Sequence, residues 1–137
     1  MKMNIITSLL LIFSSGNAVA VEVETLFTCE ESEDKDNWFE VGIAMSDGPG
    51  FQLILVEHDN VVAGKPKQSL AASVPVQKVN STTFANKSST TTLTIKKGRR
   101  GQKIGKLAMK AAGAGSLYFE GMNCFSGGTI QFDAPRN

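Results

Sequence analysis

Three residues of one stretch, Glu40, Glu57 and His58, carry the side chains from which a hydrolytic site would be built. His58 is the only histidine, so any Ser-His-Asp arrangement would have to use it. Its sequence neighbour Asp59 would point to the opposite face of a strand, and no G-x-S-x-G motif is present. A histidine at the end of a strand beside Trp38 is typical of a structural residue. A hydrolase that uses Glu40, Glu57 or His58 is therefore the least favoured of three functional hypotheses.

A second set of reactive side chains forms a basic segment. Seven of the chain's 14 Lys and Arg residues lie between Lys96 and Lys110. Gly98 and Gly101 predict a projecting turn within it, where cationic groups would be available to carboxylate, phosphate or sulfate groups. The predicted binding residues are Lys97, Arg99, Arg100 and Lys103.

The expected partner of this basic segment is an anionic macromolecule or a protein of unknown identity. Aromatic residues are not interleaved with the charges, so base stacking and a nucleic-acid partner are not supported. The competing and favoured interpretation is a solvated hairpin, whose charges keep a strand edge soluble and unpaired.

The two cysteines, Cys29 and Cys124, lie near opposite ends of the chain. We expect them to form one disulfide that joins the first strand of the fold to the last. A zinc site needs three or four ligands, which one histidine and two paired cysteines do not supply. We therefore expect no metal and no cofactor.

The first 20 residues have the features of a secretory signal peptide. A basic start at Lys2 precedes an apolar run from Ile5 to Phe13 and the small-x-small sequence Ala18-Val19-Ala20. The run is too short for a permanent membrane span, and no second apolar stretch follows. We expect cleavage near Ala20 and a single secreted or periplasmic domain over residues 21–137; the sequence specifies neither the compartment nor the oligomeric state.

Opposite charges are separated along the expected mature chain. Residues 21–60 carry eleven acidic groups and one basic group, whereas residues 61–137 carry twelve basic groups and two acidic groups. These charges cancel over the whole chain, so a general attraction to nucleic acid or membrane is not expected. Two short sequences, at Asn80 and Asn86, match N-glycosylation acceptors, which matters only in a eukaryotic secretory pathway.

The stretch from Trp38 to His58 predicts the hairpin around which the other strands assemble. In its first half, Phe39, Val41, Ile43 and Met45 alternate with Trp38, Glu40 and smaller residues, which predicts a strand with one buried face. Pro49 and Gly50 suit a tight turn. A five-residue turn predicts three opposed apolar pairs, Val41 with Leu55, Ile43 with Leu53 and Met45 with Phe51.

Further strands are predicted along the chain from alternation and turn residues. A first strand covers residues 21–30, with Val21, Val23, Phe27 and Cys29 on one face, and a short strand near residues 74–79 is confined to an edge or bulge by Pro75. Others cover residues 90–97, 104–110, 117–124 and 129–133, and the strand over 117–124 has apolar groups on both faces. The fold class is all-β: a single small antiparallel β-sandwich or closed barrel of about seven or eight short strands, its termini tied by one disulfide.

Three functions fit a small exported β domain of this kind. The first is an exported, non-enzymatic binding domain, inhibitor-like or adhesin-like, which uses the basic turn. The second is a barrel that encloses a small apolar ligand, with Trp38, Tyr118 and the methionines along its interior. The third is the hydrolase described above.

In layout, the chain is loosely similar to the bacterial inhibitors of c-type lysozyme, which are small periplasmic β-barrels with a disulfide. The likeness covers export, size and the pair Cys29 and Cys124. The Ser-Gly-x-x-Tyr motif of that family is absent, and Ser116-Leu117-Tyr118 does not replace it. We therefore infer no membership of that family.

Overall fold

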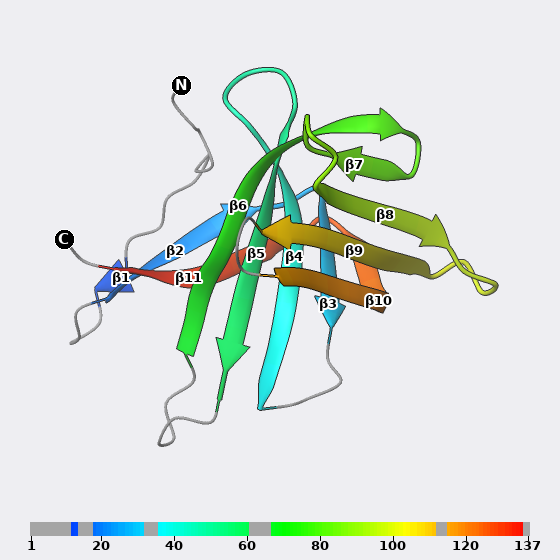
Figure 1. The fold of residues 1–137 in the computed structure, drawn as a ribbon. Helices are drawn as coiled ribbons and strands as arrows, with labels where there is room; N and C mark the ends of the chain where they lie inside the picture. Colours follow the sequence, from blue (N-terminus) through cyan, green and yellow to red (C-terminus); the bar gives the residue numbers. More distant parts are fainter. Residues whose placement is uncertain (1–11, 14–17, 32–35, 61–66, 112–114, 136–137) are drawn as a thin grey trace.

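The computed structural model describes residues 12–13, 18–31, 36–60, 67–111 and 115–135. These residues form eleven β-strands and no helix (Figure 1). The strands are β1 (Ile12–Phe13), β2 (Ala18–Glu24), β3 (Phe27–Glu31), β4 (Asn37–Met45), β5 (Phe51–Asp59), β6 (Lys67–Asn80), β7 (Thr83–Ala85), β8 (Thr91–Lys97), β9 (Lys103–Ala111), β10 (Gly115–Ser126) and β11 (Thr129–Pro135).

Eight of these strands, β3 to β10, form a closed antiparallel barrel. Each strand pairs with the next one along the chain, and β10 pairs with β3 to close the circle. This up-and-down closure leaves no barrel strand without neighbours on both sides, although the pairing through β7 covers only three residues. The predicted all-β class is confirmed, and of the two predicted architectures the structure has the barrel.

The hairpin of β4 and β5 has the predicted register. Val41 lies opposite Leu55, Ile43 opposite Leu53, and Met45 opposite Phe51. The turn is tightened by the Ser46 hydroxyl, which donates to the backbone carbonyl groups of Gly48 and Gly50 at 3.1 Å each. The sequence could give this register because only one pairing keeps the apolar side chains together.

The expectation that this hairpin buries only one face is wrong. Ala44, Ile54 and Val56 point away from the barrel interior and are nevertheless buried. They are covered by an antiparallel ribbon of β2 and β11, which contributes the buried side chains of Val23 and Ile130 to a second core (Figure 1). The hairpin is therefore buried on both faces.

Close packing of the ribbon on β4 depends on Gly42. A Cβ atom at this position would lie 2.4 Å from Cδ1 of Ile130 and 2.7 Å from Cγ2 of Thr25. Both are closer than real Cβ contacts, so a larger residue would force the side chains of Ile130 and Thr25 to move. The absence of a side chain at Gly42 therefore allows these two side chains to pack directly on β4.

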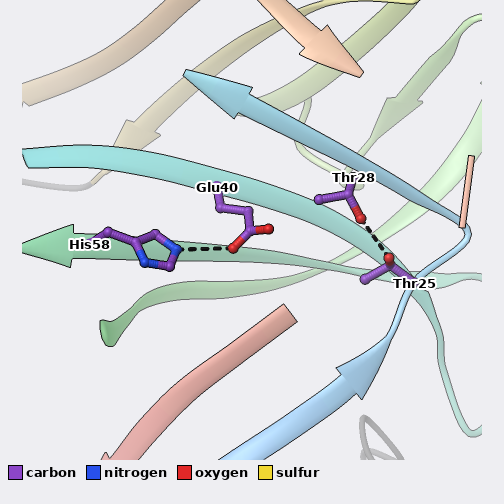
Figure 2. A network of polar contacts seen from close by, with 4 residues as sticks. All are labelled: Thr25, Thr28, Glu40 and His58. Atoms are coloured by element: carbon purple, nitrogen blue, oxygen red, sulfur yellow. Dashed lines mark hydrogen bonds and ion pairs between the residues drawn. The ribbon is translucent and has the colours of Figure 1, made fainter. Parts of the chain in front are cut away.

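The predicted single strand over residues 21–30 is wrong, because the chain changes layers at Thr25 and Leu26. Val21 and Val23 in β2 belong to the second core, whereas Cys29 in β3 belongs to the barrel core. The crossing is held by the hydroxyl groups of Thr25 and Thr28, which lie 2.7 Å apart (Figure 2) and 3.2 and 3.1 Å from the carbonyl oxygen of Gly127. A mature chain that starts at Val21 retains the buried side chains of Val21 and Val23.

β10 contains a β-bulge that alternation could not reveal. The register against β9 shifts between Phe119 and Met122, with Gly121 at a φ of 68°. The extra residue changes the side-chain parity, so Phe119 and Met122 both face the barrel core. Apolar side chains were predicted on both faces of residues 117–124, but the bulge places most of them on the inner face. Tyr118, which is 54% exposed, points outward.

β6 is longer than predicted. It runs from Lys67 to Asn80 rather than over residues 74–79 alone. Pro75 lies opposite Gln52, while the other edge of β6 pairs with β11 only at Ser69 and with β7 only from Gln77 onward. Pro75 was predicted to lie at an edge or a bulge, and the side of β6 that faces away from β5 has no paired strand at this position among the described residues.

The predicted disulfide between Cys29 and Cys124 is confirmed. It joins β3 to β10, which are the first and last strands of the barrel and not, as expected, of the whole fold. The two residues lie directly opposite each other in the closing pair of strands. Both cysteines are buried in the barrel core, and the backbone of Gly105 in β9 lies against them. A Cβ atom at Gly105 would lie 2.5 Å from Sγ of Cys124 and 3.0 Å from Sγ of Cys29.

Gly105→Ala should therefore lower the free energy of unfolding of the oxidised protein by about 1 to 3 kcal/mol, because the cross-linked sulfur atoms cannot rotate away from the added methyl group. The same substitution in a Cys29→Ala/Cys124→Ala background should cost less, because truncation of the sulfur atoms vacates this space. Denaturant unfolding of the four proteins measures both effects. An equal cost in the two backgrounds would show that the methyl group does not meet the disulfide.

Candidate binding site at the basic end of the barrel

The predicted binding residues lie around the turn between β8 and β9. Within this turn, the N–H group of Gly98 donates to the carbonyl group of Gln102 at 2.6 Å, and the N–H group of Arg100 donates to the Gln102 side chain at 2.9 Å. These bonds occupy polar groups of the turn itself and leave the side chains of Arg99 and Arg100 exposed. The turn projects from the barrel, at the right of the view (Figure 1).

Lys97 and Lys103 lie directly opposite each other at the base of the turn. Both stand on the strand face that lines the barrel interior, because Ile95 and Gly105, two residues away on each strand, face the core and the disulfide. Lys103 is half-buried: its ammonium group donates to the Ser126 hydroxyl and lies 5.0 Å from the centre of the Phe27 ring. Lys97 and Lys103 thus lie together at one mouth of the barrel, which we call the basic end.

Like charges placed directly opposite on neighbouring strands repel each other. In the part of the chain that the structure describes, no ion pair joins Lys97 or Lys103 to an acidic side chain. Their cation–π and hydroxyl contacts orient Lys103 without neutralising it. The basic end therefore retains a concentrated positive charge that an external anion would relieve.

Glu40, Glu57 and His58 do not form a common site. Nε2 of His58 lies 2.9 Å from Oε1 of Glu40 (Figure 2). The imidazole also stacks on Trp38, with ring centres 3.9 Å apart. Glu57 lies on the other face of the hairpin, where its carboxylate accepts a hydrogen bond from the Asn37 side chain at 3.0 Å. The carboxylates are therefore separated by the sheet.

The sequence predicted His58 beside Trp38, which is confirmed, but the contact with Glu40 was missed. The predicted register of the hairpin could have revealed this contact. Trp38 lies opposite His58 and Glu40 opposite Val56, so Glu40 and His58 are diagonal neighbours on one face. The side chains of His58 and Glu40 are only 10% and 12% exposed. Packing and pairing of this kind fit the predicted structural role of the histidine.

The side chains expected to line a ligand-enclosing barrel lie elsewhere. Trp38 is on the outer face with Glu40 and His58, and Tyr118 is exposed, with its hydroxyl group donating to Glu120 at 3.0 Å. Met109 and Met122 do face inward, but they are packed in the barrel core. The interior between the described strands is occupied by apolar side chains of the chain itself.

Within the described ranges, no group of three or more His, Cys, Asp or Glu side chains is gathered in a way that would hold a metal ion. Among the same residues there is no long apolar helix of the kind that spans a bilayer.

Comparison of the chain with models of protein families, with curated proteins and with solved structures finds no match.

Proposed function

We propose that this chain is an exported, non-enzymatic binding domain that takes an acidic protein partner at the basic end of its barrel. The observation that carries the proposal is the opposition of Lys97 and Lys103 with no acidic partner among the described residues, next to the exposed Arg99 and Arg100. Guanidinium groups form paired hydrogen bonds to carboxylates, so the arginines are the expected main contacts and the lysines the supporting charge.

The arrangement of the strands weakens the competing interpretation of a hairpin that protects a strand edge. The basic start of β9 is paired on its other side with β10, where Lys103 lies opposite Cys124. A strand with neighbours on both sides needs no charge to keep it from pairing with another chain. Only the last residues of β8, beyond its pairing with β7, have an edge for which that explanation would hold.

Export is supported by two separate features. The first is the signal-peptide pattern of residues 1–20, and the second is the Cys29–Cys124 disulfide, since disulfides persist in oxidising compartments. We propose a secreted or periplasmic location on this basis. An exposed cationic turn on a disulfide-linked scaffold can bind a partner without catalytic residues.

The test is the binding of fluorescently labelled poly-L-glutamate, a model for an acidic protein segment, measured by anisotropy at rising salt. Replacing Arg99 and Arg100 by alanine should weaken binding about tenfold or more, since each charge-assisted contact contributes on the order of 1.5 to 3 kcal/mol. Binding to the unaltered protein should fall as salt rises, because exposed charges are screened. The melting temperature should hardly change, since both side chains are exposed.

The matched control is Lys87→Ala/Lys110→Ala, which removes two exposed positive charges outside the basic end. It should leave most of the binding intact. Equal losses in the two double variants would reduce the effect to net charge, and binding that is indifferent to salt would contradict an electrostatic contact. In either case the basic end would not be the binding site.

A further inference from the structure

A hollow of about 300 Å³ opens at the basic end beside the turn. Its apolar side chains come from three different strands: Phe27 from β3, Phe84 from β7 and Ile95 from β8. None of these residues is near another in the sequence, so the hollow exists only because the barrel closes. It is a site that the pattern of basic residues alone could not indicate.

The floor of the hollow is fixed by the barrel core. Phe84 is 3% exposed, and its ring lies 5.4 Å from that of Phe51 in an edge-to-face contact and 6.2 Å from that of Phe27. Phe27 and Ile95 are half-buried against the same core. An apolar group that entered the hollow would thus meet a floor that is already formed, and it would not have to order flexible side chains.

The rim of the hollow is positively charged. Four lysines from three strands line it: Lys78 from β6, Lys96 and Lys97 from β8, and Lys103 from β9. Lys78 belongs to none of the sequence-predicted binding residues, because it lies far from the basic segment in the chain and reaches the rim through the pairing of β6 with β7. Ser81 and Thr82, in the turn between those strands, add hydroxyl groups.

We propose that this hollow binds a small amphipathic monoanion, in which a carboxylate is attached to a short apolar chain. The apolar floor would bury the chain, and the ammonium groups would hold the carboxylate and relieve the repulsion between Lys97 and Lys103. The volume is at the lower limit of small-molecule sites, so one short chain fills it. A neutral ligand would leave the lysine charges uncompensated, and a cation would add to them.

This inference shares Lys97 and Lys103 with the proposed protein-binding site but does not rest on it. The lining of the hollow includes Lys78 and excludes Arg99 and Arg100. The two sites can therefore be separated by substitution: changes to the arginines affect the projecting turn, and changes to Lys78 affect the hollow.

The experiment is a titration of the protein with butanoate, hexanoate and octanoate, followed by two-dimensional NMR. Binding should saturate, the shifts should centre on Phe27, Phe84 and Ile95, and affinity should rise about fourfold for each methylene group that becomes buried. Octylamine, which has the same chain and the opposite charge, should bind at least tenfold more weakly than octanoate. Equal binding of octanoate and octylamine would overturn the proposal, as would shifts that centre elsewhere.

Variants complete the test without touching the barrel core. Lys78→Gln/Lys97→Gln should weaken octanoate binding about tenfold or more, whereas Lys106→Gln/Lys110→Gln, the matched control on the exposed side of β9, should leave it unchanged. The Arg99→Ala/Arg100→Ala protein should bind octanoate normally even where it has lost poly-L-glutamate. Loss of octanoate binding in the arginine variant or in the control would show that general positive charge, and not the hollow, binds the anion.

Discussion

Replacing Cys29 and Cys124 together by alanine should lower the free energy of unfolding by about 4 to 5 kcal/mol. The bond spans 95 residues of sequence, so its removal frees a very long loop in the unfolded state. It also lies at the place where the barrel closes. Only four residue pairs join β3 to β10, which makes this pairing one of the shorter ones in the barrel.

Denaturant unfolding of the oxidised protein and of the double variant measures the effect, with the oxidised state established by mass spectrometry of unreduced peptides. Chemically reduced protein is the control, because it keeps both sulfur atoms in the core and loses only the bond. Its stability should lie between those of the other two proteins, with most of the loss already present. Detection of free Cys29 and Cys124 in the folded oxidised sample, or a loss below about 1 kcal/mol, would contradict the role of the bond in closing the barrel.

Hydrogen exchange can locate the same effect in the fold. Amide groups of β3 and β10 should lose more protection than those of β4 and β5, whose pairing extends over nine residues and is closed by a short turn. Uniform loss of protection would mean that the bond stabilises the chain only through the unfolded state.

What the sequence could predict was local. The β4–β5 register followed from parity and a five-residue turn, and the turn between β8 and β9 followed from its glycines, because both depend on residues that are close in the chain. The second core did not follow, since it requires the β2–β11 ribbon to pack on the outside of β4. Two features of the sequence agree with it: Gly42 is a glycine inside an otherwise well-formed strand, and Ile54 and Val56 interrupt the alternation of β5 with apolar residues on its outer face.

The candidate site, too, could be predicted only in part. Lys97, Arg99, Arg100 and Lys103 were visible as a run of charge, and the structure places them together at one end of the barrel. The apolar floor of the hollow could not be predicted, because in the sequence Phe27, Phe84 and Ile95 look like ordinary core residues of separate strands. Their meeting depends on barrel closure, and closure depends on contacts between residues far apart in sequence.

Ile43→Ala and Leu53→Ala should each lower the free energy of unfolding by about 2 to 5 kcal/mol. Both side chains are 0% exposed and lie directly opposite each other in the barrel core, between the hairpin and the far strands. Each truncation leaves a cavity that the closed barrel has little freedom to collapse, because its strands are paired on both sides.

Ile104→Ala is the matched control for Ile43→Ala, since it removes the same atoms from a side chain that is 37% exposed on the outside of β9. In β9, Ile104 lies on the opposite face from the buried side chains of Leu107 and Met109. Its truncation should cost roughly 0.5 kcal/mol, the usual scale for surface changes.

The Ile43→Ala/Leu53→Ala protein should depart from additivity by about 0.5 kcal/mol or more, because the two cavities adjoin. Equal costs for Ile43→Ala and Ile104→Ala in denaturant unfolding would show that the register of β4 and β5 does not define the core, and additive costs would show that the two side chains do not share one packed layer.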